Sequence, residues 1–330
     1  MKKAIDEANK ASDLVFPNPK VGCVIVQNGK IVSKGFHQKY GGPHAEVEAL
    51  NSCDIKLKDA TMYVTLEPCN HDGKTPPCTA LINTDKFKRI VIASSDPNPL
   101  INKGSQALID KGLKVDFNIC NKKAKHINQR FFTYYEKKRP YVILKFAATL
   151  DGFISENNGH SKWITSKKSR HSVHVLRSTC EAILVGRKTI ENDNPSLTSH
   201  GIGPDPRIVI LDPSNKINEQ CAALNKNTIH FTDELASNKL EDNIQHILSK
   251  LHTLNIQSLL VEGGAKTLTS FINSGNFDEI HAYYAPKFIG EGISIYNSKK
   301  KISDSLNLNI VKHESFDNDI KIIYQNKKAQ

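Results

Sequence analysis

One histidine, one glutamate and two cysteines have the residue types and spacing of a metal site. His44 and Glu46 stand one residue apart in "GGPHAEVEAL", and Cys69 and Cys78 lie in "TLEPCNHDGKTPPC". One imidazole and two thiolates supply three protein ligands, which leaves the fourth position of a tetrahedral zinc ion open for water, as in catalytic zinc sites. A zinc-bound water ionises near neutral pH, and Glu46, which is not needed as a ligand, can take its proton and pass it on.

The spacing of the two cysteines leaves three possibilities open: a shared metal ion, a disulfide, or unrelated core thiols beside a surface histidine. Cys69 and Cys78 are too far apart for the Cys-x-x-Cys pair of most zinc and redox motifs. The chain has seven cysteines without framework spacing, which disfavours a disulfide scaffold and favours metal ligands or catalysts. His-x-Glu followed by Pro-Cys is the signature of zinc-dependent deaminases. We therefore interpret His44, Cys69 and Cys78 as ligands of one zinc ion per chain.

Composition indicates a soluble, globular, two-domain chain. It has 330 residues, of which 38% are hydrophobic and 24% charged, and no apolar run reaches the length of a membrane span. No secretory segment follows the first lysines, so we expect a cytoplasmic protein. The net charge of +11 raises the question of nucleic acid, but the lysines are scattered and form no basic stripe with aromatic residues. A basic surface also suits phosphorylated small molecules, and we expect no nucleic-acid or membrane partner.

Alternating strand and helix patterns predict an α/β protein. In the first part we expect a hairpin over residues 21–36, strands over 61–67, 89–94 and 113–119, and helices over 2–11, 44–53, 104–112 and 121–137. The segment "KKRP" marks a boundary, because proline disfavours continuation of a helix. Strands are expected beyond it over 141–154, 181–186, 207–212, 258–264 and 278–286. The pattern predicts two domains, residues 1–139 and 140–330.

The first domain resembles the bacterial bifunctional riboflavin-biosynthesis deaminase/reductase family. The resemblance rests on "PNPKVGCVIV", "PHAEVEAL" and "TLEPCNHDGKTPPC", and the eight residues between the cysteines are that family's own pattern. It implies a cytidine-deaminase-like α/β/α layered sheet that deaminates 2,5-diamino-6-ribosylamino-4(3H)-pyrimidinone 5′-phosphate. Substrate-binding positions of the family match Asn18, His71, Lys74, Asp96 and Asn98. Lys74 can pair with a phosphate, and the Asn and Asp side chains can read ring edges or ribose hydroxyls.

The resemblance extends through the second domain and implies a dihydrofolate-reductase-like α/β domain that reduces the ribosyl group to ribityl with NADPH. In "SLLVEGGAKTL" two glycines stand between a strand and a helix start, where backbone N–H groups can approach a phosphate. The family's cofactor positions match Ala147, Trp163, Thr189, Asp193, Gly264, Ala265, Lys266, Thr267, Leu268, Thr269 and Ser270. Its substrate positions match Ser161, Arg177, Leu197, His200 and Glu262, and Lys145 and Asp151 are further candidates.

Two residues depart from the family pattern. His200 stands where the family usually has an arginine, and Pro213 stands where it tends to have a cofactor-contacting serine. An imidazole is mostly neutral at pH 7 and makes no bidentate phosphate contact. We expect an active reductase that binds the substrate phosphate less tightly and in a pH-dependent way.

The sequence thus predicts a zinc- and NADPH-dependent enzyme of riboflavin biosynthesis. Because relatives associate, we expect a homo-oligomer. One alternative is a nucleoside or tRNA deaminase with a degenerate second domain, which the positive charge keeps open. The other alternative is a non-catalytic binding protein with degenerate sites. The intact His-Glu-Cys-Cys set argues against this alternative for the first domain.

Overall fold

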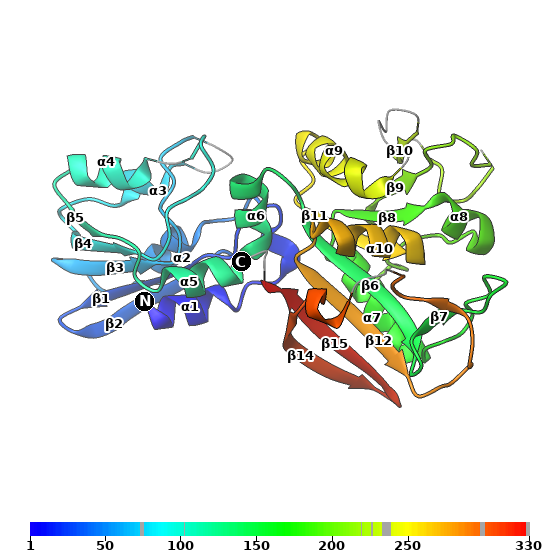
Figure 1. The fold of residues 1–330 in the computed structure, drawn as a ribbon. Coiled ribbons are helices and arrows are strands. Elements are labelled where there is room, and N and C mark those ends of the chain that lie inside the picture. The colour runs from blue at the N-terminus through cyan, green and yellow to red at the C-terminus, as the bar shows by residue number, and fades with distance from the viewer. Residues whose placement is uncertain are drawn as a thin grey trace. The chain divides into compact units, whose positions relative to one another are not determined.

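The computed structural model of the chain divides into two compact units, Met1–Lys137 and Lys138–Gln330 (Figure 1). The structure describes residues 1–72, 76–101, 103–218, 220–225, 227–232, 239–297 and 301–327. Within these ranges, no helix has both the length and the apolar character needed to cross a membrane.

The first unit is built around one sheet with parallel and antiparallel strands. Its elements are α1 (Lys2–Ala8), the 3-10 helix η1 (Asp13–Val15), β1 (Gly22–Gln27), β2 (Lys30–Phe36), α2 (Ala45–Asn51), β3 (Ala60–Val64), α3 (Cys78–Leu81), β4 (Phe87–Ile92), α4 (Gly104–Asp110), β5 (Lys114–Asp116), α5 (Asn121–Ile127) and α6 (Gln129–Lys137). The described strands are ordered β2-β1-β3-β4-β5. The predicted hairpin is confirmed as β1 and β2, and β3, β4 and β5 run parallel to one another.

Two glycines allow helices to approach both faces of this sheet. A Cβ atom at Gly22 would lie 2.1 Å from the carbonyl oxygen of Ala4 in α1, and one at Gly35 would lie 2.3 Å from the amide nitrogen of Ala49 in α2. Gly35 pairs with Cys23, the neighbour of Gly22 on β1. Because successive strand residues face opposite sides, α1 and α2 cover opposite faces. The expected α/β/α layering is therefore present.

The prediction of a single helix over residues 121–137 is wrong. The chain forms α5 and α6 with Asn128 between them. The side chain of Asn128 accepts a hydrogen bond from the Lys20 N–H and donates one to the Lys20 carbonyl, both at 2.8 Å. An asparagine that bonds to another backbone segment competes with the helix at that point, and this contact was not visible in the sequence pattern.

The second unit has a larger sheet. Its elements are β6 (Tyr141–Thr149), β7 (Phe153–Ser155), α7 (Lys167–Ser178), β8 (Ala182–Gly186), α8 (Arg187–Asp193), β9 (Arg207–Leu211), β10 (Ile229–Phe231), α9 (Leu240–Thr253), β11 (Ser258–Gly263), α10 (Ala265–Ser274), β12 (Glu279–Ala285), β13 (Ile293–Ser294), η2 (Ile302–Asp304), β14 (Leu308–Phe316) and β15 (Asp319–Asn326). The described strands are ordered β10-β9-β8-β11-β6-β12-β15-β14, and β7 pairs separately with β13. The strands from β10 to β12 are parallel, whereas β15 and β14 are antiparallel.

The strand expected over residues 141–154 is too long. β6 ends at Thr149, and the N–H of Gly152 donates to the Thr149 carbonyl at 3.0 Å. Gly152 has a φ of +89°, a conformation that glycine adopts at low cost. The segment "TLDG" is therefore a turn, and the residues after it form β7.

The core of this unit lies on both faces of the sheet. Along β6, Val142 belongs to a buried cluster with Ile247 of α9 and Phe271 of α10. The next residue, Ile143, belongs to another cluster with Leu176 of α7. This alternation follows from the two-residue period of a strand, and it places helices on the two sides of β6.

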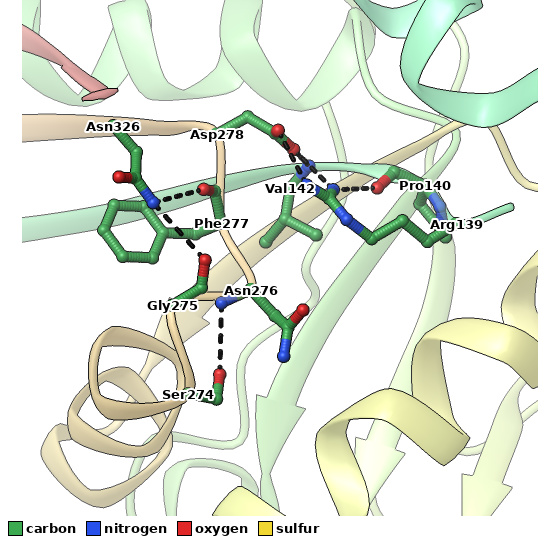
Figure 2. A network of polar contacts seen from close by, with 9 residues as sticks. All are labelled: Arg139, Pro140, Val142, Ser274, Gly275, Asn276, Phe277, Asp278 and Asn326. Carbon is green, nitrogen blue, oxygen red and sulfur yellow. Dashed lines mark hydrogen bonds and ion pairs between the residues drawn. The ribbon is translucent and has the colours of Figure 1, made fainter. Parts of the chain in front are cut away.

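A buried ion pair ties the start of the second unit to its sheet (Figure 2). Two nitrogens of the Arg139 guanidinium bond the two carboxylate oxygens of Asp278 at 2.7 and 2.9 Å, and both side chains are almost fully buried. Arg139 also donates to the Pro140 carbonyl, and the Val142 N–H donates to Asp278. Near the other end of the chain, the backbone N–H of Asn326 donates a hydrogen bond to the Asp278 carbonyl. The network fixes how β6 enters the sheet.

We predict that Asp278→Ala lowers the free energy of unfolding of the second unit by about 3–5 kcal/mol, because it leaves a buried guanidinium without its partner. Asp317→Ala is the matched control, since the Asp317–Lys168 pair is exposed and such pairs contribute about 0–1 kcal/mol. Urea unfolding followed by the fluorescence of Trp163, the single tryptophan, measures both. Equal costs for the two variants would contradict the role assigned to Asp278.

Candidate active sites

Three metal-ligand side chains converge in the first unit. His44 is the N-cap residue of α2, Cys78 begins α3, and Cys69 lies in the loop after β3. Nδ1 of His44 lies 3.2 Å from Sγ of Cys78 and 3.5 Å from Sγ of Cys69, and the three ligand atoms all lie within 4.8 Å of one another. A tetrahedral zinc ion with bonds of about 2.0–2.3 Å separates its ligand atoms by roughly 3.5 Å. The predicted ligand set is therefore assembled with the spacing that zinc requires.

The protein environment favours a thiolate at this cluster. The hydrogen bond from the Cys78 thiol lowers the pKa of Cys69 to about 4, and the hydrogen bond from His44 acts in the same direction against burial. The backbone N–H of Cys78 also donates to the Cys69 sulfur at 3.3 Å. As the donor of the pair, Cys78 has a raised pKa. Thiolates are the form in which cysteine binds metal.

Glu46 lies in the first turn of α2, close to the candidate ligand His44, and is only 4% exposed. Burial raises the pKa of its carboxyl group, and the positive charge that His44 can carry opposes this effect. A carboxyl group with a raised pKa can accept and return a proton near neutral pH. This property fits the expected role of Glu46 as the proton carrier.

His37, which the sequence analysis missed, connects Asn18 to the cluster. Its Nδ1–H donates to the Pro43 carbonyl at 2.9 Å, so its Nε2 accepts from the side-chain amide of Asn18 at 3.1 Å. The His37 ring stands edge-on to the His44 ring, with 5.5 Å between the centroids. The only signal in the sequence was a histidine at the end of the hairpin's second strand, seven residues before His44.

Asp96 and Asn98 are held by a network that starts on the neighbouring loop. Glu67 accepts from the Asp96 N–H and from the N–H and hydroxyl of Ser105. Asp96 accepts the Asn98 N–H, and Asn98 donates to the Tyr135 hydroxyl. Burial raises the pKa of Asp96 to about 7, although the Asn98 N–H opposes it. Both candidates are thus fixed in the loop after β4, the parallel neighbour of β3.

The remaining candidates of the first unit are His71 and Lys74. Nδ1 of His71 is buried without a hydrogen-bond partner among the described residues. It lies in the inserted loop between Cys69 and Cys78. Lys74 falls outside the described residues.

In the second unit, three charged candidates meet around one buried carboxylate. Glu262 of β11 accepts two hydrogen bonds from the Arg177 guanidinium at 2.8 and 2.9 Å, and Nζ of Lys145 lies 3.8 Å away. Burial alone would raise the pKa of Glu262, but Arg177 and Lys145 outweigh it and lower the pKa to about 2. Glu262 is therefore a permanent anion whose two cationic neighbours come from α7 and β6.

Leu197 and His200 lie on the segment beside Arg177. The remaining terminal nitrogen of Arg177 donates to the Thr198 carbonyl at 3.2 Å. Leu197 is 2% exposed, and its side chain packs in the core. The His200 ring contacts the ring of His174 in a tilted arrangement. The sequence analysis also missed His174.

Two strand-to-helix turns meet to form a cradle. β11 ends at Gly263, α10 begins at Ala265, and the N–H of Gly264 between them donates to Oγ1 of Thr189 in α8 at 2.9 Å. A Cβ atom at Gly186, where β8 ends, would lie 3.1 Å from Oγ1 of Thr267. The expected Gly-Gly turn is therefore confirmed. The close approach of the turns places backbone N–H groups at the start of α10 beside Thr189.

The other predicted cofactor residues occupy different environments. Within the turn and helix start, Lys266 is exposed, whereas Leu268 packs in the core and Thr267 and Ser270 are buried. The cofactor positions outside this segment are Ala147 on β6, Asp193 at the end of α8, and Trp163 before α7. Ser161, a predicted substrate position, also lies before α7. The Trp163 side chain is 63% exposed and lies against the Arg170 guanidinium at 4.2 Å.

Asp151 and Pro213 lie in structured turns. Oδ2 of Asp151 accepts the N–H groups of Ile289 and Gly290, so this side chain holds a loop together. Pro213 is exposed and follows Asp212, a buried carboxylate that accepts the N–H groups of residues 216 and 217. The carboxylate of Asp212, not the residue at 213, organises the turn after β9.

Family comparisons agree with this arrangement. Residues 140–322, more than half of the chain, match the RibD C-terminal domain, and residues 1–94 match the zinc-binding region of cytidine and deoxycytidylate deaminases. The chain is 43% identical to the riboflavin biosynthesis protein RibD of Aquifex aeolicus, over 98% of this chain and 97% of that protein. The chain belongs to the RibD family. It is also 31% identical to RibD of Escherichia coli K12, over 92% of each protein.

Solved structures place the RibD fold over nearly the whole chain. A diaminohydroxyphosphoribosylaminopyrimidine deaminase/5-amino-6-(5-phosphoribosylamino)uracil reductase from Thermotoga maritima matches with a TM-score of 0.83 at 37% identity, over 99% of this chain and 97% of that one. RibD of Acinetobacter baumannii matches with a TM-score of 0.85 at 32% identity, over 98% and 97%. The protein is thus a bifunctional deaminase and reductase of riboflavin biosynthesis.

We predict that Glu262→Gln destabilises the second unit of this RibD protein by about 3 kcal/mol at pH 7, the equivalent of lowering a carboxyl pKa from 4.5 to about 2. A carboxylate with a lowered pKa stabilises the fold fully above its ordinary pKa and loses this effect as the pH falls toward the folded value. The difference between wild type and variant should therefore narrow below about pH 5. Urea unfolding across this pH range measures it, with the exposed Glu291→Gln as control. A difference that is independent of pH would refute the assignment.

Proposed function

We propose that residues 1–139 form a zinc-dependent deaminase and residues 140–330 an NADPH-dependent reductase, which act in this order on 2,5-diamino-6-ribosylamino-4(3H)-pyrimidinone 5′-phosphate. The observation that carries the first half is the convergence of His44, Cys69 and Cys78 beside a buried Glu46. The second half is carried by the Glu262 charge cluster next to the Gly264 turn.

The first-unit residues fit zinc in type and number. One imidazole nitrogen and two sulfurs leave a tetrahedral ion one open position, where it would supply a water that ionises near neutral pH. Glu46 would take that proton and deliver it to the ring nitrogen. It would then carry a second proton, from the hydroxyl group that has added to the ring carbon, to the amine, which leaves as ammonia while the carbonyl forms. The buried position and raised pKa of Glu46 suit a group that must both accept and release a proton.

The substrate ring is expected to lie between Asn18 and the Asp96–Asn98 loop. His37 fixes the orientation of the Asn18 amide, since its Nε2 takes one of the amide hydrogens. Asp96, with a pKa near 7, can either donate or accept a hydrogen bond to a pyrimidine edge. The inserted loop with His71 and Lys74 is the proposed contact to the substrate phosphate.

In the reductase half, the cradle formed by Gly264 and Thr189 fits the phosphates of a dinucleotide, because it offers close backbone approach at a helix start. NADPH would supply the hydride, which adds to C1′ of the ring-opened sugar imine. The C=N electron pair moves to nitrogen and takes a proton. Lys145 is the donor that the structure offers, since burial lowers its pKa although Glu262 opposes this. A weakened ammonium is a better acid.

Homo-oligomer formation and a cytoplasmic location remain predictions from the sequence. All seven cysteines are free thiols. This state is typical of a reducing compartment.

A coupled assay tests the order of the two reactions. Zinc-loaded protein given the diaminopyrimidine ribosyl phosphate should release ammonia without NADPH, and NADPH should be oxidised only after ammonia release. Cytidine and an adenosine-containing tRNA stem-loop serve as alternative substrates in parallel. Ammonia from either of these, with none from the diaminopyrimidine, would instead establish a nucleoside or tRNA deaminase.

We predict that Glu46→Gln lowers the rate of ammonia release by about 10²–10⁴-fold, the usual contribution of a general acid–base. Zinc content and NADPH oxidation with the deaminated substrate should be retained, because Glu46 is not a ligand and belongs to the first unit. Glu48→Gln is the control, since Glu48 lies on the same helix and its carboxylate accepts an exposed hydrogen bond from Gln38. If Glu46→Gln lost its zinc, Glu46 would have to be counted as a ligand.

A further inference from the structure

Two histidines with their rings in contact stand beside the Glu262 charge cluster. The rings of His174 and His200 lie 4.1 Å apart between centroids, at an interplanar angle of 49°. His174 lies one turn before Arg177 on α7, so the two side chains share a face of the helix. Nδ1 of His174 is buried and has no hydrogen-bond partner among the described residues. A buried polar atom without a partner is costly and suits a site that is completed by a ligand.

The cations near this pair are already engaged. Arg177 uses Nε and one terminal nitrogen on Glu262, and its other terminal nitrogen donates to the Thr198 carbonyl. Lys145 also lies next to Glu262. Part of the positive charge that a substrate phosphate needs is therefore committed to a carboxylate of the protein.

The charged groups that face the pair nearly cancel. Arg177 and His171 come from the same helix as His174, Glu262 comes from β11, and Asp205 faces His200 from the loop that follows it. Leaving the imidazoles aside, the two cations at Glu262, Arg177 and Lys145, are offset by the carboxylates of Glu262 and Asp205. A phosphate monoester brings about 1.5–2 negative charges, so a phosphate placed here requires new positive charge.

We propose that His174 and His200 together form the phosphate contact of the reductase, and that the pair takes up a proton when the phosphorylated substrate binds. The proposal rests on the reductase function proposed above. On protonation, both nitrogens of an imidazole become donors, so the unpartnered Nδ1 of His174 gains a partner in a phosphate oxygen.

His174 is neutral before the phosphate arrives. Burial, reinforced by His200 and Arg177, lowers the pKa of His174 to about 4. A bound dianion raises it. Between the free and bound pKa values, binding takes up one proton, so affinity falls as the pH rises, by up to tenfold per pH unit. The second ionisation of the phosphate, near pH 6, acts in the opposite direction and is present in every variant.

The test compares the reductase KM for the deaminated substrate and for its dephosphorylated form at about pH 6 and about pH 8. For wild type we expect the KM of the phosphorylated substrate to rise about three- to tenfold with pH, with little change for the dephosphorylated one. His174→Gln and His200→Gln should each raise this KM about tenfold at about pH 6 and remove its increase between about pH 6 and about pH 8. Most of the decrease in kcat/KM should come from KM rather than from kcat. His200→Arg should give a low KM at both pH values. The exposed His313→Gln is the control.

A second readout is independent of turnover. NMR titration of the histidine ring protons of the full-length protein, with and without ribose 5-phosphate, should show an increase in the pKa of His174 on binding and no change for His313. The proposed phosphate contact would be wrong if the wild-type KM for the phosphorylated substrate did not change with pH. It would also be wrong if this KM changed equally with pH in His174→Gln. If no substrate supports NADPH oxidation, the proposed reductase function fails. In that case the NMR titration alone tests whether the histidines bind a phosphate, and a His174 pKa that does not change with ribose 5-phosphate would reject this contact.

Discussion

The parallel pairing of neighbouring strands determines where chemistry can occur in both units. Parallel neighbours end at the same edge of a sheet, and the loops that leave them meet there. In the first unit, the loops after β3 and β4 are joined by the bond between Glu67 and the Asp96 N–H. In the second, the turns after β8 and β11 are joined by the bond between Thr189 and Gly264. Without this pairing, neither the deaminase nor the reductase residues would share a site.

Two buried glutamates show how the surroundings of a carboxyl group determine its pKa. Glu46 and Glu262 are both largely withdrawn from water, yet burial raises the pKa of the first, while Arg177 and Lys145 hold that of the second at about 2. A carboxyl group of the first kind exchanges protons, whereas one of the second kind keeps a fixed charge. The same type of side chain thus suits proton exchange in one unit and orders cations in the other.

Much of this arrangement was predictable from local sequence. The hairpin, the convergence of His44, Cys69 and Cys78, and the Gly-Gly turn each depend on residues close together in the chain or on a characteristic spacing, and each is present. The break at Asn128 and the ion pair between Arg139 and Asp278 were not predictable, because they depend on partners 108 and 139 positions away. Local patterns carry no information on such distant contacts.

His37 and His174 were missed for a related reason. Neither belongs to a motif, and each acquires a role only because folding places its ring against another histidine, at 5.5 Å from His44 and 4.1 Å from His200. A histidine with no special spacing is more often an ordinary surface or core residue. Only the packed structure shows which rings share a site with charged groups.

The replacement of an expected arginine by His200 makes physical sense within this charge balance. An arginine keeps its charge at all pH values, so it would stand beside Arg177 and Lys145 as an additional cation whenever the substrate phosphate is absent. A histidine pair avoids that repulsion, because burial keeps His174 neutral until an anion favours its protonation. The same property weakens the pair at high pH, where the proton is scarce. Under the proposed pair, the charge of the phosphate site follows the presence of the ligand rather than being built permanently into the fold.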